Sequence, residues 1–109
     1  MTRARLDNRR PCEHIDFQHG DTKATVTVGF RVRDRGDILV MEASEIFMRS
    51  QKAGSDAEAE ARDAGIAISL AMQSGVSLGD LQHSVTRTDT GEPATMTGAA
   101  LDTIVKTYG

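Results

Sequence analysis

The segment RRPCEHIDFQHGD, residues 9–21, gathers more potentially reactive side chains than any other part of the sequence. It holds the only cysteine, Cys12, together with His14, Asp16 and His19. Thiolate, imidazole and carboxylate groups are the usual ligands of zinc in proteins. A cysteine beside a histidine is also the pairing that activates a sulfur nucleophile. The segment therefore suggests a metal site formed by these four residues, or a thiol-dependent site centred on Cys12.

The spacing of these residues argues against both kinds of site. Alternating polarity predicts a β-strand over residues 12–18, with Ile15 and Phe17 on one face. Neighbours on the other face then lie about 6.6 Å apart, from a rise of about 3.3 Å per residue, whereas zinc ligands approach the ion to about 2.0–2.3 Å. The same spacing separates a thiol from an imidazole two residues away. We expect no catalytic residue and no cofactor, and we interpret the segment as the first strand of a sheet.

The residues that follow predict an antiparallel sheet. Gly20 and Asp21 suit a tight hairpin turn with glycine in its first central position. Residues 23–33, KATVTVGFRVR, alternate between apolar and polar side chains, as in a strand with one buried and one solvated face. A turn then leads to a third strand over residues 42–49. Residues 38–41, ILVM, either extend that strand or form a wide connection.

After this sheet the sequence predicts a long helix. Ser55 and Glu58 form a capping box at its start, and Gly75 suits the left-handed position that ends it. The first half is rich in alanine, which allows close approach to a sheet. In residues 64–72 the only polar side chain is that of Ser69, which predicts burial on several sides.

Two shorter helices complete the predicted fold. Ser77 with Asp80 repeats the capping pattern and begins a short helix, and Thr97 is expected to cap the last one. Strands that are followed by a block of helices predict an α+β fold. We expect a two-layer sandwich, in which a three-stranded antiparallel meander is followed by three helices packed on one face.

Composition limits the classes of function. With 109 residues the chain is the size of one domain, and we expect a basic flexible N-terminal arm at residues 1–10 before a single α+β domain at residues 11–109. A single cysteine excludes an intramolecular disulfide and fits a reducing cytoplasm. No window approaches the roughly 18 apolar residues of a membrane span. We therefore expect a cytoplasmic protein with no membrane contact.

Basic side chains suggest an anion-binding alternative. The net charge is −3, yet the first ten residues carry Arg3, Arg5, Arg9 and Arg10. This N-terminal arm could contact a nucleotide or nucleic acid, together with a polar strand face that holds Thr25, Thr27, Arg31 and Arg33. The loop at residues 87–96 is long enough to carry contacts as well. The candidate binding residues are Arg31, Arg33, Arg87, Thr88 and Glu92.

One family resemblance gives a lead. Residues 54–86, GSDAEAEARDAGIAISLAMQSGVSLGDLQHSVT, and the later GAALDTIV resemble the TSCPD domain. That domain occurs at the C-terminus of some adenosylcobalamin-dependent (class II) ribonucleotide reductases and also as short stand-alone proteins. The resemblance extends over roughly residues 12–105. The chain lacks the Thr-Ser-Cys-Pro-Asp motif that names the family, so the resemblance implies no cysteine-dependent role.

The resemblance implies a non-catalytic accessory or interaction domain that acts by protein–protein contact. Its implied partner is a ribonucleotide reductase large chain, because one cysteine and 109 residues cannot supply reductase chemistry. The alternatives are a small anion- or nucleic-acid-binding protein and, third, a metal- or thiol-dependent site at Cys12. A homodimer is also expected, since open edge strands of small sandwiches often pair. The sequence does not show which edge would do so.

Overall fold

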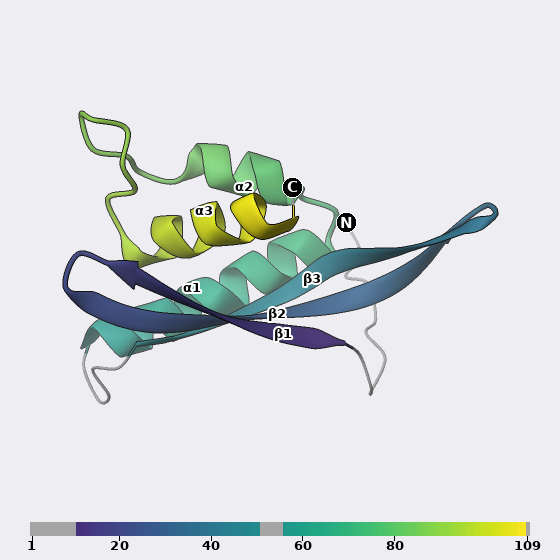
Figure 1. Cartoon of the computed structure of the whole chain (residues 1–109), viewed down its shortest axis with the longest axis horizontal. Coiled ribbons are helices and arrows are strands. Elements are labelled where there is room, and N and C mark those ends of the chain that lie inside the picture. Colours follow the sequence, from purple (N-terminus) through teal and green to yellow (C-terminus); the bar gives the residue numbers. More distant parts are fainter. Residues whose placement is uncertain (1–10, 51–55, 109) are drawn as a thin grey trace.

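A computed structural model describes residues 11–50 and 56–108 of the chain. The sheet comes first and the three helices follow it, with α2 and α3 together on one side of the sheet (Figure 1). The expected α+β class, with a three-stranded antiparallel meander before three helices, is thereby confirmed. The expected N-terminal arm and the capping residue Ser55 lie outside the described residues. The elements are β1 (Cys12–His19), β2 (Thr22–Arg35), β3 (Ile38–Ser50), α1 (Asp56–Gln73), α2 (Leu78–Ser84) and α3 (Met96–Tyr108).

The three strands pair in sequence order, with β2 in the centre. Gly20 adopts a φ of 58° in the turn between β1 and β2, which confirms the expected glycine turn. The segment at residues 38–41 belongs to β3, so the ILVM sequence extends the third strand. A register shift between Gly29 and Phe30 divides the β2–β3 ladder into two parts.

Helix α1 lies along the edge of β3 that β2 leaves open. The Ser69 hydroxyl accepts the Ile46 N–H at 2.8 Å and lies 3.1 Å from the Ile46 carbonyl oxygen. One helical turn later, the Gln73 amide donates to the Ser44 carbonyl at 3.1 Å. Close approach depends on Gly65, where a Cβ atom would meet the Ile46 carbonyl oxygen at 2.9 Å. The helix therefore takes the place of a fourth strand and satisfies the backbone groups of a covered edge.

The burial expected around the second half of α1 is wrong in part. Ile68 and Met72 are buried, but Ile66 and Leu70 remain 47% and 41% exposed. The reason is that Ser69 faces the edge of β3, so Ile68 and Met72 on one flank of the helix reach the core. Ile66 and Leu70 lie on the other flank, away from the core.

The core lies between the sheet and the helices α1 and α3. Alternate residues of β2 supply one side of it, as the period-two pattern of residues 23–33 predicts, together with Ile46 and Met48 of β3. Helices α1 and α3 supply the other side, and α2 packs only partly buried side chains against the cluster. The largest fully buried apolar side chains are Val26, Val28, Ile46, Leu101 and Ile104.

The caps of the later helices follow the predicted chemistry with one correction. Ser77 accepts the Asp80 N–H and begins α2, as expected. The expected cap of α3 at Thr97 is wrong, because the Thr95 hydroxyl accepts the Gly98 N–H at 3.0 Å and the helix begins at Met96. Met96 packs against the core, which draws the helix start toward it.

Candidate functional site

The polar row on β1 does not converge on a common point. Cys12, His14 and Asp16 stand opposite Gly29, Thr27 and Thr25 of β2. His14 Nδ1 lies 2.7 Å from the Thr27 hydroxyl, and the Thr25 hydroxyl donates to Asp16 at 2.8 Å. The His14 and Asp16 side chains therefore each bond to a different threonine on β2. Cys12 is exposed and has no disulfide.

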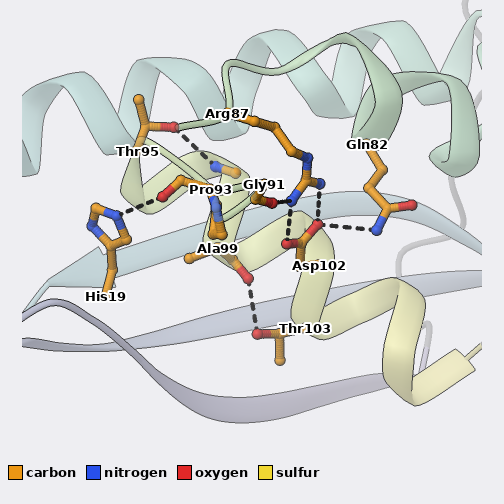
Figure 2. Close-up of polar contacts among 10 residues, drawn as sticks. His19, Gln82, Arg87, Gly91, Pro93, Thr95, Ala99, Asp102 and Thr103 are labelled. Carbon is orange, nitrogen blue, oxygen red and sulfur yellow. Dashed lines mark hydrogen bonds and ion pairs between the residues drawn. The ribbon is translucent and has the colours of Figure 1, made fainter. Parts of the chain in front are cut away.

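His19, the fourth candidate ligand, lies apart from this row. Its Nε2 atom is 3.1 Å from the carbonyl oxygen of Pro93, in the loop before α3 (Figure 2). The ring thereby connects the end of β1 to a segment 74 residues later in the sequence. Within residues 11–50 and 56–108, no group of three histidine, cysteine, aspartate or glutamate side chains is placed to hold a metal ion.

The loop that follows α2 is anchored by an ion pair. The Arg87 guanidinium donates two hydrogen bonds to the Asp102 carboxylate of α3, one of them at 2.8 Å. Gln82 of α2 donates to the same carboxylate at 3.0 Å, and Arg87 also reaches the Gly91 carbonyl at 3.2 Å (Figure 2). The hydrogen bond from Arg87 holds the pKa of Asp102 below its ordinary value, and burial opposes this only in part. The same contact raises the pKa of Arg87.

Backbone hydrogen bonds complete the structure of this loop. The Thr88 N–H donates to the Glu92 carbonyl oxygen at 2.8 Å, and the Ala94 N–H donates to the Thr86 carbonyl oxygen at 3.0 Å. These two bonds make a small hairpin. Gly91 turns the chain with a φ of 88°. The predicted binding residues Arg87, Thr88 and Glu92 thus come together here. Arg87 is committed to the fold, whereas Thr88 and Glu92 remain exposed at the surface.

Arg31 and Arg33, the other predicted binding residues, converge on Glu42 of the neighbouring strand. Arg33 donates to Glu42 at 3.2 Å, and Arg31 lies 3.9 Å from the same carboxylate. They border a groove of about 660 Å³, which β2, β3, the end of α1 and Tyr108 line together. In this groove the Arg31 Nε atom is buried and hydrogen-bonds to no described residue. The single carboxylate of Glu42 therefore offsets part of the positive charge of this arginine pair.

A second groove, of about 620 Å³, lies between the outer face of the sheet and α1. Its lining mixes polar groups such as His14 and Arg62 with the half-exposed side chains of Phe47 and Ile66. His14 and Thr27 already bond to each other in it. The groove therefore offers shape and some apolar surface but no focused set of reactive groups.

The feature that sequence reasoning missed is the outer half of the β2–β3 ladder, residues 31–42, which we call the outer hairpin. It projects past the helices, at the right of Figure 1. Its large apolar side chains are exposed to an unusual degree: Val32 52%, Ile38 65%, Leu39 73% and Met41 54%. The lengths of the predicted strands could have indicated this exposure. A first strand at residues 12–18 is too short to pair along the whole of a hairpin that extends to residue 42.

Comparisons with known proteins give no further direction. The chain matches no protein-family model, no curated protein and no solved structure. No helix in the described part of the chain is long and apolar enough to cross a membrane. The functional proposal therefore depends on the surface of the molecule itself.

Proposed function

We propose that this protein is a non-catalytic interaction module that acts by protein–protein contact through its outer hairpin. The observation that carries the proposal is the exposure of Val32, Ile38, Leu39 and Met41 on one projecting element. Burying a Val, Leu, Ile or Met side chain completely stabilises by about 1.5–3 kcal/mol. A partner that covered these half-exposed side chains would gain on the order of 1 kcal/mol from each. Val32, Leu39 and Met41 share one face of this hairpin, and exposed apolar side chains gathered in this way are typical of contact sites.

The side chains that could do chemistry support a non-catalytic role. His14 and Asp16 bond to threonines of the adjacent strand, and Arg87 bonds to Asp102. These contacts position parts of the fold relative to one another. A reactive centre would instead bring a nucleophile, a base and an orienting group within hydrogen-bond reach of each other.

Protein contact is also favoured over anion binding. Arg31 and Arg33 share one carboxylate, which offsets the charge that an anionic ligand would need. Apolar side chains on the outer hairpin would gain nothing from a phosphate backbone, whose binding is electrostatic. If nucleic acid were the ligand, affinity would fall steeply with added salt, whereas an apolar contact would change little.

The partner proposed from the family resemblance is a class II ribonucleotide reductase large chain. The test is a pull-down from the native host with the tagged full chain, followed by identification of the large chain in the eluate. We expect its capture by the wild-type protein and its loss with Leu39→Lys, which places a charge in the most exposed apolar position. Ile66→Lys is the matched control, because Ile66 is also half exposed but lies on α1.

Two results would contradict this proposal. Equal capture by the wild type and by Leu39→Lys would exclude the outer hairpin as the contact surface. Absence of the reductase chain from every eluate, with other proteins retained by the wild type and lost with Leu39→Lys, would exclude that partner while leaving the surface in place.

A further inference from the structure

The outer edge of β3 has free backbone groups where α1 no longer covers it. The Phe30 N–H donates to Pro11 at 2.9 Å and so points away from β3. Because Phe30 pairs with Ala43, the backbone groups of Ala43 also point away from β2. Every second residue of a strand directs its backbone N–H and C=O groups to the same side, so those of Met41 and Leu39 also point away from β2. The outward N–H and C=O groups of Leu39 and Met41 hydrogen-bond to no described residue.

This edge also lacks the usual protection against strand pairing. Natural edge strands are guarded by charged side chains, proline, bulges or a covering element. Residues 38–41, ILVM, contain no charge and no proline, and the register shift lies farther along the ladder, at Gly29. From Ser44 to Ile46 the same edge is covered by α1. The unguarded part is therefore confined to the outer hairpin.

We propose that this edge pairs antiparallel with the same edge of a second copy, around a two-fold axis at Val40. The proposal rests on the proposed function of the outer hairpin as a contact surface. The second copy takes its backbone edge, and the faces of the paired hairpins stay open to another protein. In this register Leu39 of each copy stands opposite Met41 of the other, and both residues direct their backbone groups across the interface. The two Val40 residues face each other, and the two sheets become one continuous sheet.

The register joins apolar side chains on both faces of the new sheet. Val32 lies beside Met41 within each copy, so one face would carry Val32, Met41 and the second copy's Leu39 in a row. These three side chains are each more than half exposed in the single chain. On the opposite face the two Val40 side chains meet, and Ile38 stands opposite the second copy's Glu42. The exposed apolar side chains of the outer hairpin thereby gain cross-strand neighbours from the second copy.

Charge favours β3 as the pairing edge over the outward edge of β2. An antiparallel two-fold pairing of β2 centred on Val32 would set Arg31 opposite Arg33, and one centred on Arg33 would set that residue against itself. Like charges directly opposite each other destabilise a strand pair. In the β3 pairing the two Arg33 residues are separated by both Val40 strands, about 14 Å at a spacing of about 4.8 Å. That separation exceeds the screening length of about 8 Å at physiological salt.

The first test measures the oligomeric state of the purified full chain by sedimentation equilibrium. We expect a dimer at micromolar concentration, and a monomer for the doubly substituted L39K/M41K, in which lysine would stand opposite lysine twice. The dissociation constant of the L39K/M41K dimer should be at least about 100-fold higher than that of the wild type, because opposed like charges at an interface cost several kcal/mol. The charge-matched L39K/M41E should dimerise again, and mixing L39K/M41K with L39E/M41E should give heterodimers.

The second test fixes the register by cross-linking. The two Val40 residues would form a non-hydrogen-bonded pair with Cα atoms about 4.5 Å apart, within the range that a disulfide spans. Oxidation of V40C in a C12S background should therefore give a covalent dimer. V32C in the same background is the control, because Val32 lies one strand away from the axis.

These measurements separate failure of this inference from failure of the proposed function. A monomer at all concentrations, a dimer that persists in L39K/M41K, or cross-linking of V32C in preference to V40C would each overturn the pairing. Because only the purified chain is present, none of these results affects capture of another protein by the outer hairpin. Open-ended association beyond the dimer would also overturn it, since a two-fold pairing closes.

Discussion

The two halves of β3 carry similar apolar side chains in opposite environments. Ile46 is fully buried, whereas Ile38 is 65% exposed eight residues earlier in the same strand. The difference comes from α1, which bonds to Ser44 and Ile46 through Gln73 and Ser69 and ends where the outer hairpin begins. Side-chain hydrophobicity therefore does not decide burial along this strand. What decides it is whether another element can reach the backbone edge.

Truncation of the two halves should give the largest contrast. Ile46→Ala removes a fully buried side chain and should lower the free energy of unfolding by about 2–5 kcal/mol. Leu39→Ala acts on a side chain that is 73% exposed in the single chain, and at a protein concentration where the chain is monomeric it should change the free energy of unfolding by less than about 0.5 kcal/mol. Urea unfolding of both variants checks the contrast. Comparable losses would show that the outer hairpin is buried in the folded protein.

The buried polar bond of the covered half gives the next largest effect. Ser69→Ala leaves the Ile46 N–H without its acceptor in a buried position and should cost about 1–3 kcal/mol. Ser84→Ala is the matched control, because that hydroxyl bonds to the Asp80 carbonyl at the surface of α2. The measurement is the difference in denaturation midpoint. A loss for the control as large as that for Ser69→Ala would contradict the special role of the covered edge.

Close approach of α1 to β3 can be tested at a glycine. Gly65→Ala brings a Cβ atom to 2.9 Å from the Ile46 carbonyl oxygen, so the helix must move away from the strand. Overpacking of about 1–3 kcal/mol should outweigh the gain of up to about 1 kcal/mol in helix propensity. Gly79→Ala in α2 meets no atom within 4 Å and should be neutral or slightly stabilising. The melting temperature should therefore fall for Gly65→Ala, and it should stay the same or rise slightly for Gly79→Ala.

The smallest expected effect is a dependence of stability on pH. The α1–β3 contact is made by neutral side chains, whereas the loop before α3 is anchored by the charged pair of Arg87 and Asp102. Ser69 and Gln73 are neutral, so their contribution should not vary with pH. The pKa of Asp102 is lowered by Arg87, so this carboxylate stabilises the folded state above its ordinary value of 3.8, and the stabilisation is lost as the pH falls below that value. The difference in melting temperature between the wild type and Asp102→Asn should shrink over this acid range.

Local signals in the sequence predicted the strands, the helix order and the cap at Ser77, because periodicity and capping chemistry act over a few residues. The state of residues 38–41 depended on a longer-range fact. Four apolar residues fit a buried connection as well as an exposed strand, and only the length of α1 decides between them. The role of Ser69 was likewise hidden, because one polar residue in an apolar run does not indicate a backbone partner 23 residues away.

The bond from His19 to Pro93 has a consequence for the order in which the protein folds. Contacts between β1 and β2, between β2 and β3, and between β3 and α1 join residues that are near in sequence, whereas the end of β1 and the loop before α3 meet across 74 residues at this bond. Contacts that close long loops tend to form late, because their entropic cost comes before their reward. We expect Ile46→Ala to slow folding and Ile104→Ala mainly to speed unfolding, which stopped-flow chevron plots would resolve. The last helix would then dock on a sheet that has already formed.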